Sequence, residues 1–222
     1  MKKLTIALLL LAGLASAKPA FETKKLSESG KATAKTMGYN ASVSYPNCPA
    51  GAAMARTEMA SFHKDLAEMG PASDPTRKAS LDLSYEVLYN GPSLTTAYIS
   101  GIADFAGAHP STLQRALLIS PQGAAIQPAQ CFQKGWLTAL RDYSRPILKK
   151  RLKDGDPDWI TKGTEATADN YKVILPQAKQ LKVIFTDYQV CSHAEGPQEV
   201  LIPYSALRQQ INPKGPLAFA LQ

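Results

Sequence analysis

The sequence lacks the residue patterns that mark common enzyme classes. It has no Gly-x-Ser-x-Gly nucleophile turn, no His-Glu-x-x-His zinc pair and no glycine-rich phosphate-binding loop. Cysteine is scarce, and Cys48, Cys131 and Cys191 are too far apart for a Cys-x-x-C zinc site. These absences argue against catalysis and favour a binding or structural protein. We expect no cofactor, no resident metal and no nucleic-acid partner.

Long apolar runs are also missing after the N-terminus. Met1-Lys-Lys is basic, residues 4–14 are apolar, and Ala15-Ser16-Ala17 fits a small-x-small cleavage site. A membrane span needs about 20 apolar residues, and the run is shorter. We therefore expect a signal peptide over 1–17, a secreted or periplasmic protein, and no membrane span after cleavage.

An oxidising compartment favours one disulfide among the three cysteines, and one thiol is then left over. Spacing alone does not settle the pairing. Cys131 and Cys191 are the favoured pair, because both lie at loop edges in what looks like the same half of the fold.

About 205 residues follow the predicted cleavage site, enough for one sizeable core. Residues 18–38 are polar and predict a flexible leader, so residues 39–222 form the expected single domain. Without Lys2 and Lys3 the formal charge falls from +7 to about +5, with 23 basic residues against 18 acidic. Such an excess suits anionic wall polymers or lipid headgroups, but we favour the simpler interpretation that it keeps the protein soluble.

Periodic patterns predict an α+β fold, with an antiparallel β-sheet and two main helices packed on one face. Apolar residues recur at helical spacing in two segments and alternate at strand spacing in the others. Asn90-Gly91 is a strong hairpin signal. The predicted helices cover 51–69 and 132–153, with a short one at 204–211, and the predicted strands cover 39–45, 81–89, 93–105, 112–120, 171–175, 181–188 and 198–202.

Two motifs resemble the RsiV-like domain family. The first is an aromatic strand, a glycine turn and an Ile-Pro-Tyr-x-x-Leu tail, with matches at Phe185, Tyr188, Gly196, Val200, Ile202, Pro203, Tyr204 and Leu207. The second is Ala106-Gly107-Ala108-His109, with a later turn at Pro121-Gln-Gly123. That family supplies the extracellular half of lysozyme-sensing anti-sigma factors and occurs beside the catalytic domain of secreted peptidoglycan deacetylases. The resemblance implies a binding domain without catalysis of its own.

The candidate binding residues are exposed aromatic and polar side chains near strand ends and loops. Gly107 and Gly196 are the expected turn residues: Gly107 lets the chain approach closely beside His109, and Gly196 tolerates a positive φ. His109 is read as a residue that holds its turn rather than as a ligand, and His193 as an exposed loop residue. The predicted binding set is Tyr98, His109, Tyr188, Glu195 and Tyr204.

We therefore expect an exported, non-catalytic binding domain of the cell envelope. Its partner would be a peptidoglycan-related glycan or an envelope protein that acts on the wall. One alternative is a metal-assisted hydrolase that uses His109, His193 and Glu195, which requires their loops to converge. Another is a proteinaceous inhibitor of a lytic enzyme. The sequence leaves the oligomeric state open.

Overall fold

The computed structural model describes residues 21–72, 74 and 76–222. The expected signal peptide, residues 1–17, lies outside this part of the chain. Within it, no helix is both long enough and apolar enough to cross a membrane.

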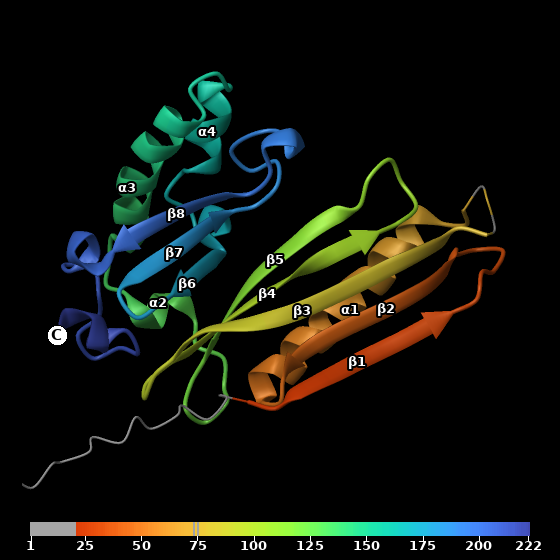
Figure 1. The fold of residues 1–222 in the computed structure, drawn as a ribbon, viewed down its shortest axis with the longest axis horizontal. Coiled ribbons are helices and arrows are strands. Elements are labelled where there is room, and N and C mark those ends of the chain that lie inside the picture. The colour runs from red at the N-terminus through yellow and green to blue at the C-terminus, as the bar shows by residue number, and fades with distance from the viewer. Residues whose placement is uncertain (1–20, 73, 75) are drawn as a thin grey trace, which may run out of the picture.

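Five strands form the larger sheet, in the order β1-β2-β3-β4-β5 (Figure 1). β2 and β3 are parallel, and every other neighbouring pair is antiparallel. The parallel pair is joined by helix α1, which lies along one face of the sheet (Figure 1). The bounds are β1 Thr23–Gly30, β2 Gly38–Pro46, α1 Pro49–Met69, β3 Lys78–Asn90, β4 Thr95–Asp104 and β5 Ser111–Ile119.

Helix α1 has the boundaries and the buried stripe that its sequence predicts. The Cys48 thiol accepts a hydrogen bond from the Gly51 amide at the N-terminus, and Gly70 ends the helix with φ 73°. The buried stripe of α1, including Met59 and Phe62, packs in one core with the alternating apolar residues of the sheet. The strand alternation predicted for β3 is present and shifts at a β-bulge between Val87 and Tyr89.

A second sheet of three antiparallel strands follows, in the order β6-β7-β8. β7 is the inner strand, as its apolar run predicts, and β8 ends at Pro203. Helices α3 and α4 lie beside this sheet (Figure 1), and Leu140, Leu148 and Ile160 share its core. The bounds are α2 Pro128–Cys131, α3 Trp136–Arg151, α4 Pro157–Gly163, β6 Val173–Pro176, β7 Gln180–Phe185 and β8 Gln198–Pro203, with short 3-10 helices at Asp169–Tyr171, His193–Glu195, Tyr204–Leu207 and Ala218–Leu221.

A small apolar cluster joins the two sheets. Val173, Leu175 and Ile184 of the smaller sheet form its buried part. Leu88, Tyr98 and Ala116 of the larger sheet pack against them. The smaller sheet therefore covers part of the face of the larger sheet that points away from α1.

The structure corrects three expectations. The strands divide into two sheets, and α1 and α3 cover different sheets instead of sharing one face. The predicted flexible leader is wrong for Thr23–Gly30, which form the edge strand β1 in register with β2. The predicted Cys131–Cys191 disulfide is absent, because all three cysteines are free and buried. Cys131 and Cys191 do lie in the same core, which is why they looked like partners.

Candidate functional site where two loops meet the open sheet face

The β4–β5 loop and the β7–β8 loop bring three aromatic rings together. The rings of His109 and His193 stack with centroids 4.6 Å apart and planes 15° apart. The ring of Tyr188 stacks on His193 at 5.6 Å and 17°. The Tyr188 hydroxyl lies 3.4 Å from His109 Nε2. We call His109, Tyr188 and His193 the ring cluster.

Tyr188 is held in a backbone conformation that few side chains adopt. Its φ is 61°, and its carbonyl accepts a 2.7 Å hydrogen bond from the indole nitrogen of Trp159 in α4. The side chain is nevertheless 51% exposed. A non-glycine residue in this region is strained by about 1–3 kcal/mol, and such strain concentrates at functional sites. The fold thus presents an aromatic ring to solvent at an energetic cost.

Asp187 lies beneath the ring cluster and connects it to the larger sheet. The Thr112 hydroxyl on β5 donates a hydrogen bond to Asp187 Oδ2. His193 Nδ1 lies 3.2 Å from the same oxygen, close enough for an ion pair but without hydrogen-bond alignment. Asp187 Oδ1 is buried and has no hydrogen-bond partner among the described residues. A buried carboxylate oxygen without a hydrogen-bond partner lowers the stability of the fold. This oxygen can accept a hydrogen bond from a donor group.

A row of side chains, polar except for Ile102, leads across the sheet to this point. The cross-strand register runs through Ser27, Ser42, Asp82, Ile102 and Thr112. Opposed residues in a sheet point to the same face, so this row ends at the residue that binds Asp187. The row therefore links the open face of the sheet to the ring cluster.

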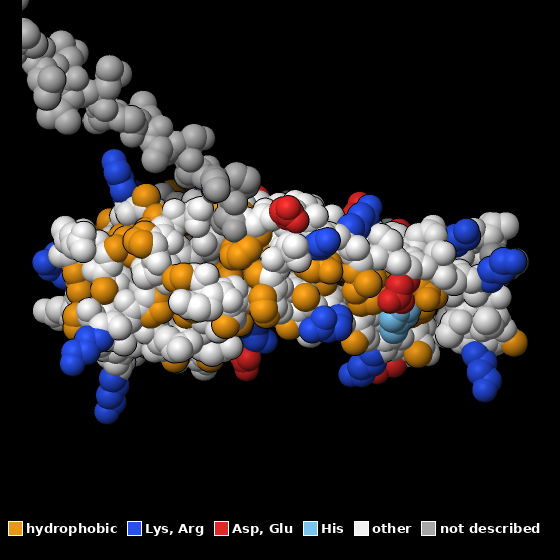
Figure 2. Space-filling model, turned by 90° about the horizontal axis from the view of Figure 1, so that it is seen from below, with side chains coloured by type: hydrophobic (Ala, Val, Ile, Leu, Met, Phe, Trp, Pro, Cys, Tyr) orange, Lys and Arg blue, Asp and Glu red, His pale blue; other side chains and the backbone are white. Residues whose placement is uncertain are grey.

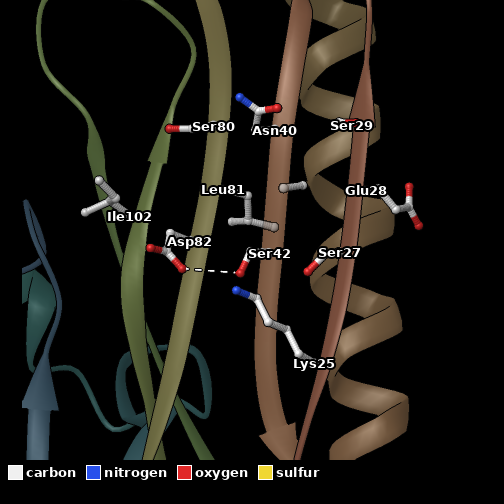
Figure 3. Close-up of a pocket in the computed structure, with 11 residues that line it drawn as sticks. Lys25, Ser27, Glu28, Ser29, Asn40, Ser42, Ser80, Leu81, Asp82 and Ile102 are labelled. Carbon is white, nitrogen blue, oxygen red and sulfur yellow. Dashed lines mark hydrogen bonds between the residues drawn. The ribbon is translucent and has the colours of Figure 1, made fainter.

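The open face of β1, β2 and β3 is hollowed and lined mainly by polar residues. Figure 3 shows serine, asparagine and aspartate side chains projecting from adjacent strands, with Ser42 Oγ donating to Asp82 Oδ1 over 3.5 Å. The depression has a volume of about 600 Å³. We call it the polar face; its lining residues are Lys25, Ser27, Glu28, Ser29, Asn40, Ala41, Ser42, Ser80, Leu81, Asp82 and Ile102.

Short hydroxyl and amide side chains, beside the charged Lys25 and Asp82, suit the polar face to a hydroxyl-rich ligand. Serine hydroxyls both donate and accept hydrogen bonds, and an asparagine amide supplies two donors and an acceptor. Their short length lets a ligand approach the sheet closely. Ile102 adds an apolar contact, since 41% of it is exposed in the middle of the row.

The ring cluster does not have the geometry of a metal site. His109 and His193 stack nearly face to face, so their in-plane lone pairs do not converge on one ion. The Glu195 carboxylate accepts a hydrogen bond from the Ser192 hydroxyl. No group of three or more His, Cys, Asp or Glu among the described residues is placed to hold a metal. The two loops converge as the hydrolase alternative requires, but the donor atoms do not.

Part of the chain is similar to one protein family. The model of DUF3298, described as a protein of unknown function, matches residues 131–205. The matched segment runs from the end of α2 through α3 and the smaller sheet to Tyr204, so it contains Asp187, Tyr188 and His193. No curated protein matches the chain.

Two solved structures share the fold over most of the chain. A DUF3298 family protein from Pseudomonas aeruginosa PAO1 has a TM-score of 0.58 at 13% identity, covering 88% of this chain and 96% of that one. A member of the same family from Bacteroides fragilis NCTC 9343 has a TM-score of 0.60 at 16% identity, covering 91% and 96%. At such identities the likeness shows the fold alone, and it extends to the larger sheet outside the matched segment.

The predicted binding residues separate into two groups. His109 and Tyr188 meet in the ring cluster, and Glu195 is exposed in the same β7–β8 loop. Tyr204 is not the exposed contact we predicted: it is 5% exposed, and its hydroxyl donates to the Gln177 carbonyl over 2.7 Å. Tyr98 is half-buried in the cluster between the sheets, where burial raises its pKa above the ordinary tyrosine value.

The predicted turn glycines also differ. Gly196 has φ 66°, as predicted. In the β4–β5 loop Ala106 has a positive φ of 60°, whereas the φ of Gly107 is not positive. The Ala106 amide donates to the Asp104 carboxylate over 2.8 Å, and this bond stabilises the turn. A Cβ on Gly107 would meet no atom within 4 Å, so the close approach of the chain expected at this glycine is absent.

The sequence did not lead us to Thr112, to the link that Asp187 makes between the ring cluster and the larger sheet, or to the polar face. A signal for the face was available, because serine or aspartate recurs at every second position in residues 27–29, 42–44 and 80–84. That alternation gives one polar side to each strand. Only the cross-strand register shows that these sides adjoin.

Proposed function

We propose that the protein is an exported, non-catalytic binding domain of the cell envelope whose polar face recognises a peptidoglycan-related glycan. The observation that carries the proposal is the continuous row from Ser27 to Thr112, which ends beside the exposed ring of Tyr188. A glycan strand is extended and rich in hydroxyl groups, so a face of hydroxyl, amide and charged side chains can form hydrogen bonds with it along several sugar units.

Tyr188 complements the polar row with an aromatic surface. Tyrosine gives a large, rigid and amphipathic contact at a low entropic cost, which is why recognition sites favour it. Its fixed backbone and its contact with His193 pre-organise the ring. Pre-organisation lowers the entropy lost on binding.

The resemblance to the RsiV-like domain supports an envelope role. Members of that family sense or act near the cell wall, and the basic N-terminus of this chain supports export. The positive net charge of the chain makes it a poor electrostatic partner for a cationic lysozyme, so a wall glycan is the better-supported ligand. Inhibition of a lytic enzyme is the alternative, and an assay of lytic activity with added protein distinguishes it.

A pull-down on purified sacculi tests the proposal. We expect the purified protein to be retained at low salt, and Tyr188→Ala and Ser42→Arg to reduce retention several-fold. Ser42→Arg places a long charged side chain on the polar face. The control is Met69→Ala, because Met69 is 55% exposed at the end of α1, away from the polar face. Absence of retention, or equal retention of all four proteins, would contradict the proposal.

The hydrolase alternative rests on the convergence of His109 and His193. It predicts a stoichiometric metal ion and loss of hydrolysis in His109→Ala. We expect metal analysis of the purified protein to find no stoichiometric ion, because stacked rings and an engaged Glu195 do not provide three converging donors.

A further inference from the structure

The outer edge of β1 is an open edge of the larger sheet. β1 pairs only with β2 and is the last strand in the sheet order. In Figure 1 it runs along the outside of the sheet over its whole length. An edge strand leaves a row of backbone N–H and C=O groups unpaired, and these can pair with another strand. Such an edge is a surface for strand addition.

The two sides of β1 carry different residues. Lys25, Ser27 and Ser29 line the polar face. On the other side, Leu26 packs against the core beneath α1, and Glu28 forms a 2.8 Å pair with His63 of α1. Lys24 shares this side by alternation, and it forms no ion pair within the described part of the chain. The side of β1 that faces α1 therefore carries Lys24, Leu26 and Glu28, in that order along the strand.

This order is self-complementary. We propose that the protein dimerises by pairing β1 antiparallel with β1 of a second copy, about a two-fold axis at Leu26. Leu26 then lies opposite Leu26 of the second copy, and Lys24 lies opposite Glu28 on both sides of the axis. Opposite charges at directly paired positions stabilise a sheet, and like charges destabilise it.

Neighbouring registers are less favourable. A two-fold axis perpendicular to the joined sheet keeps both α1 helices on the same face. Each residue must then lie opposite a residue whose side chain points to that same face, so the axis can pass only through a residue position. An axis at Lys25 places Lys25 opposite Lys25 and Glu22 opposite Glu28. An axis at Ser27 places Leu26 opposite Glu28. Charge and apolar contact therefore select the axis at Leu26.

The side of the molecule that contains the edge has the character of a weak interface. Figure 2 views the molecule from the side on which β1 lies in Figure 1 and shows a broken band of hydrophobic side chains with charges of both signs beside it. Leu26 is half-buried in the monomer and would become covered by its copy. This inference is independent of the proposed glycan binding.

Charge reversal tests the pairing. Sedimentation velocity of the purified protein at low salt, over a wide range of concentration, should show a monomer–dimer equilibrium. Lys24→Glu places one glutamate opposite Glu28 on each side of the axis and should raise the dimer dissociation constant at least about tenfold. The double variant Lys24→Glu/Glu28→Lys should restore dimerisation. Lys35→Glu, with the same charge change at an exposed position outside the strand, is the control and should leave it unchanged.

Cross-linking provides a second measurement that does not depend on the charged variants folding normally. Directly opposed residues of antiparallel strands lie about 4.5–5.5 Å apart at Cα, within disulfide range. Leu26→Cys should therefore form a disulfide-linked dimer under mild oxidation, whereas Leu201→Cys, 46% exposed on β8, should not. A protein that stays monomeric at every concentration overturns the inference, as does a dimer that Lys24→Glu leaves unchanged.

Discussion

Replacing Gly196 by alanine probes the loop that positions His193 and Tyr188. Gly196 follows the short 3-10 helix His193–Glu195 and has φ 66° and ψ −175°. Its amide donates to the His193 carbonyl over 3.0 Å, and its carbonyl accepts from the Cys191 thiol and the Gln198 amide. The backbone at this residue therefore ties the start of β8 to the loop.

The expected magnitude follows from the local geometry. A Cβ on Gly196 would meet no atom within 4 Å, so steric overlap contributes nothing. What remains is the backbone conformation, which is essentially restricted to glycine and costs other residues about 1–3 kcal/mol. We expect Gly196→Ala to lower the free energy of unfolding by about 2 kcal/mol and the melting temperature by about 4–8 °C. Valine, with its β-branch, should cost more.

Urea unfolding followed by circular dichroism measures this change. The matched control is Gly107→Ala in the β4–β5 loop. A Cβ there also meets no atom within 4 Å, but φ is not positive. That substitution should be neutral or stabilising by no more than about 1 kcal/mol. If Gly196→Ala were as stable as the wild type, or if both variants lost the same stability, the reasoning from φ would be refuted.

Four further substitutions or treatments have defined expectations. Ala106→Gly should stabilise the protein by about 0.5–1 kcal/mol in urea unfolding, because φ is 60° there. Glu58→Gln should destabilise it by about 1–3 kcal/mol in the same assay, since the buried Glu58 carboxylate accepts two hydrogen bonds from Arg115. Burial raises the pKa of the Cys131 thiol to about 12, so mass spectrometry should find Cys131 unalkylated by iodoacetamide at pH 8 until denaturant is added. Burial also raises the pKa of Tyr204 above its ordinary value of 10.0. The contribution of the neutral Tyr204 side chain to stability is therefore complete below that pH and is lost as pH rises above it, and thermal melts of Tyr204→Phe should show a smaller alkaline loss than the wild type.

The sequence by itself determined several of the individual elements. Apolar spacing located α1, and alternation located β3, because burial on one side of a helix or strand leaves a local periodic record. Asn90-Gly91 marked the hairpin, and Gly196 marked a turn with positive φ, since few other residues adopt that conformation. His109 and Tyr188 were also found from the sequence, through the motifs that carry them.

Only the tertiary structure decided how these elements combine. Thr23–Gly30 is polar and exposed, so no local signal separates an edge strand from a flexible leader; pairing with β2 makes it a strand. The division into two sheets, the free thiols of Cys131 and Cys191, and the burial of Tyr204 depend on packing between distant segments. The candidate site is of the same kind. His109 and Tyr188 meet in it although they are 79 positions apart in the sequence. Strand register and loop packing bring them together, and the local sequence does not encode either.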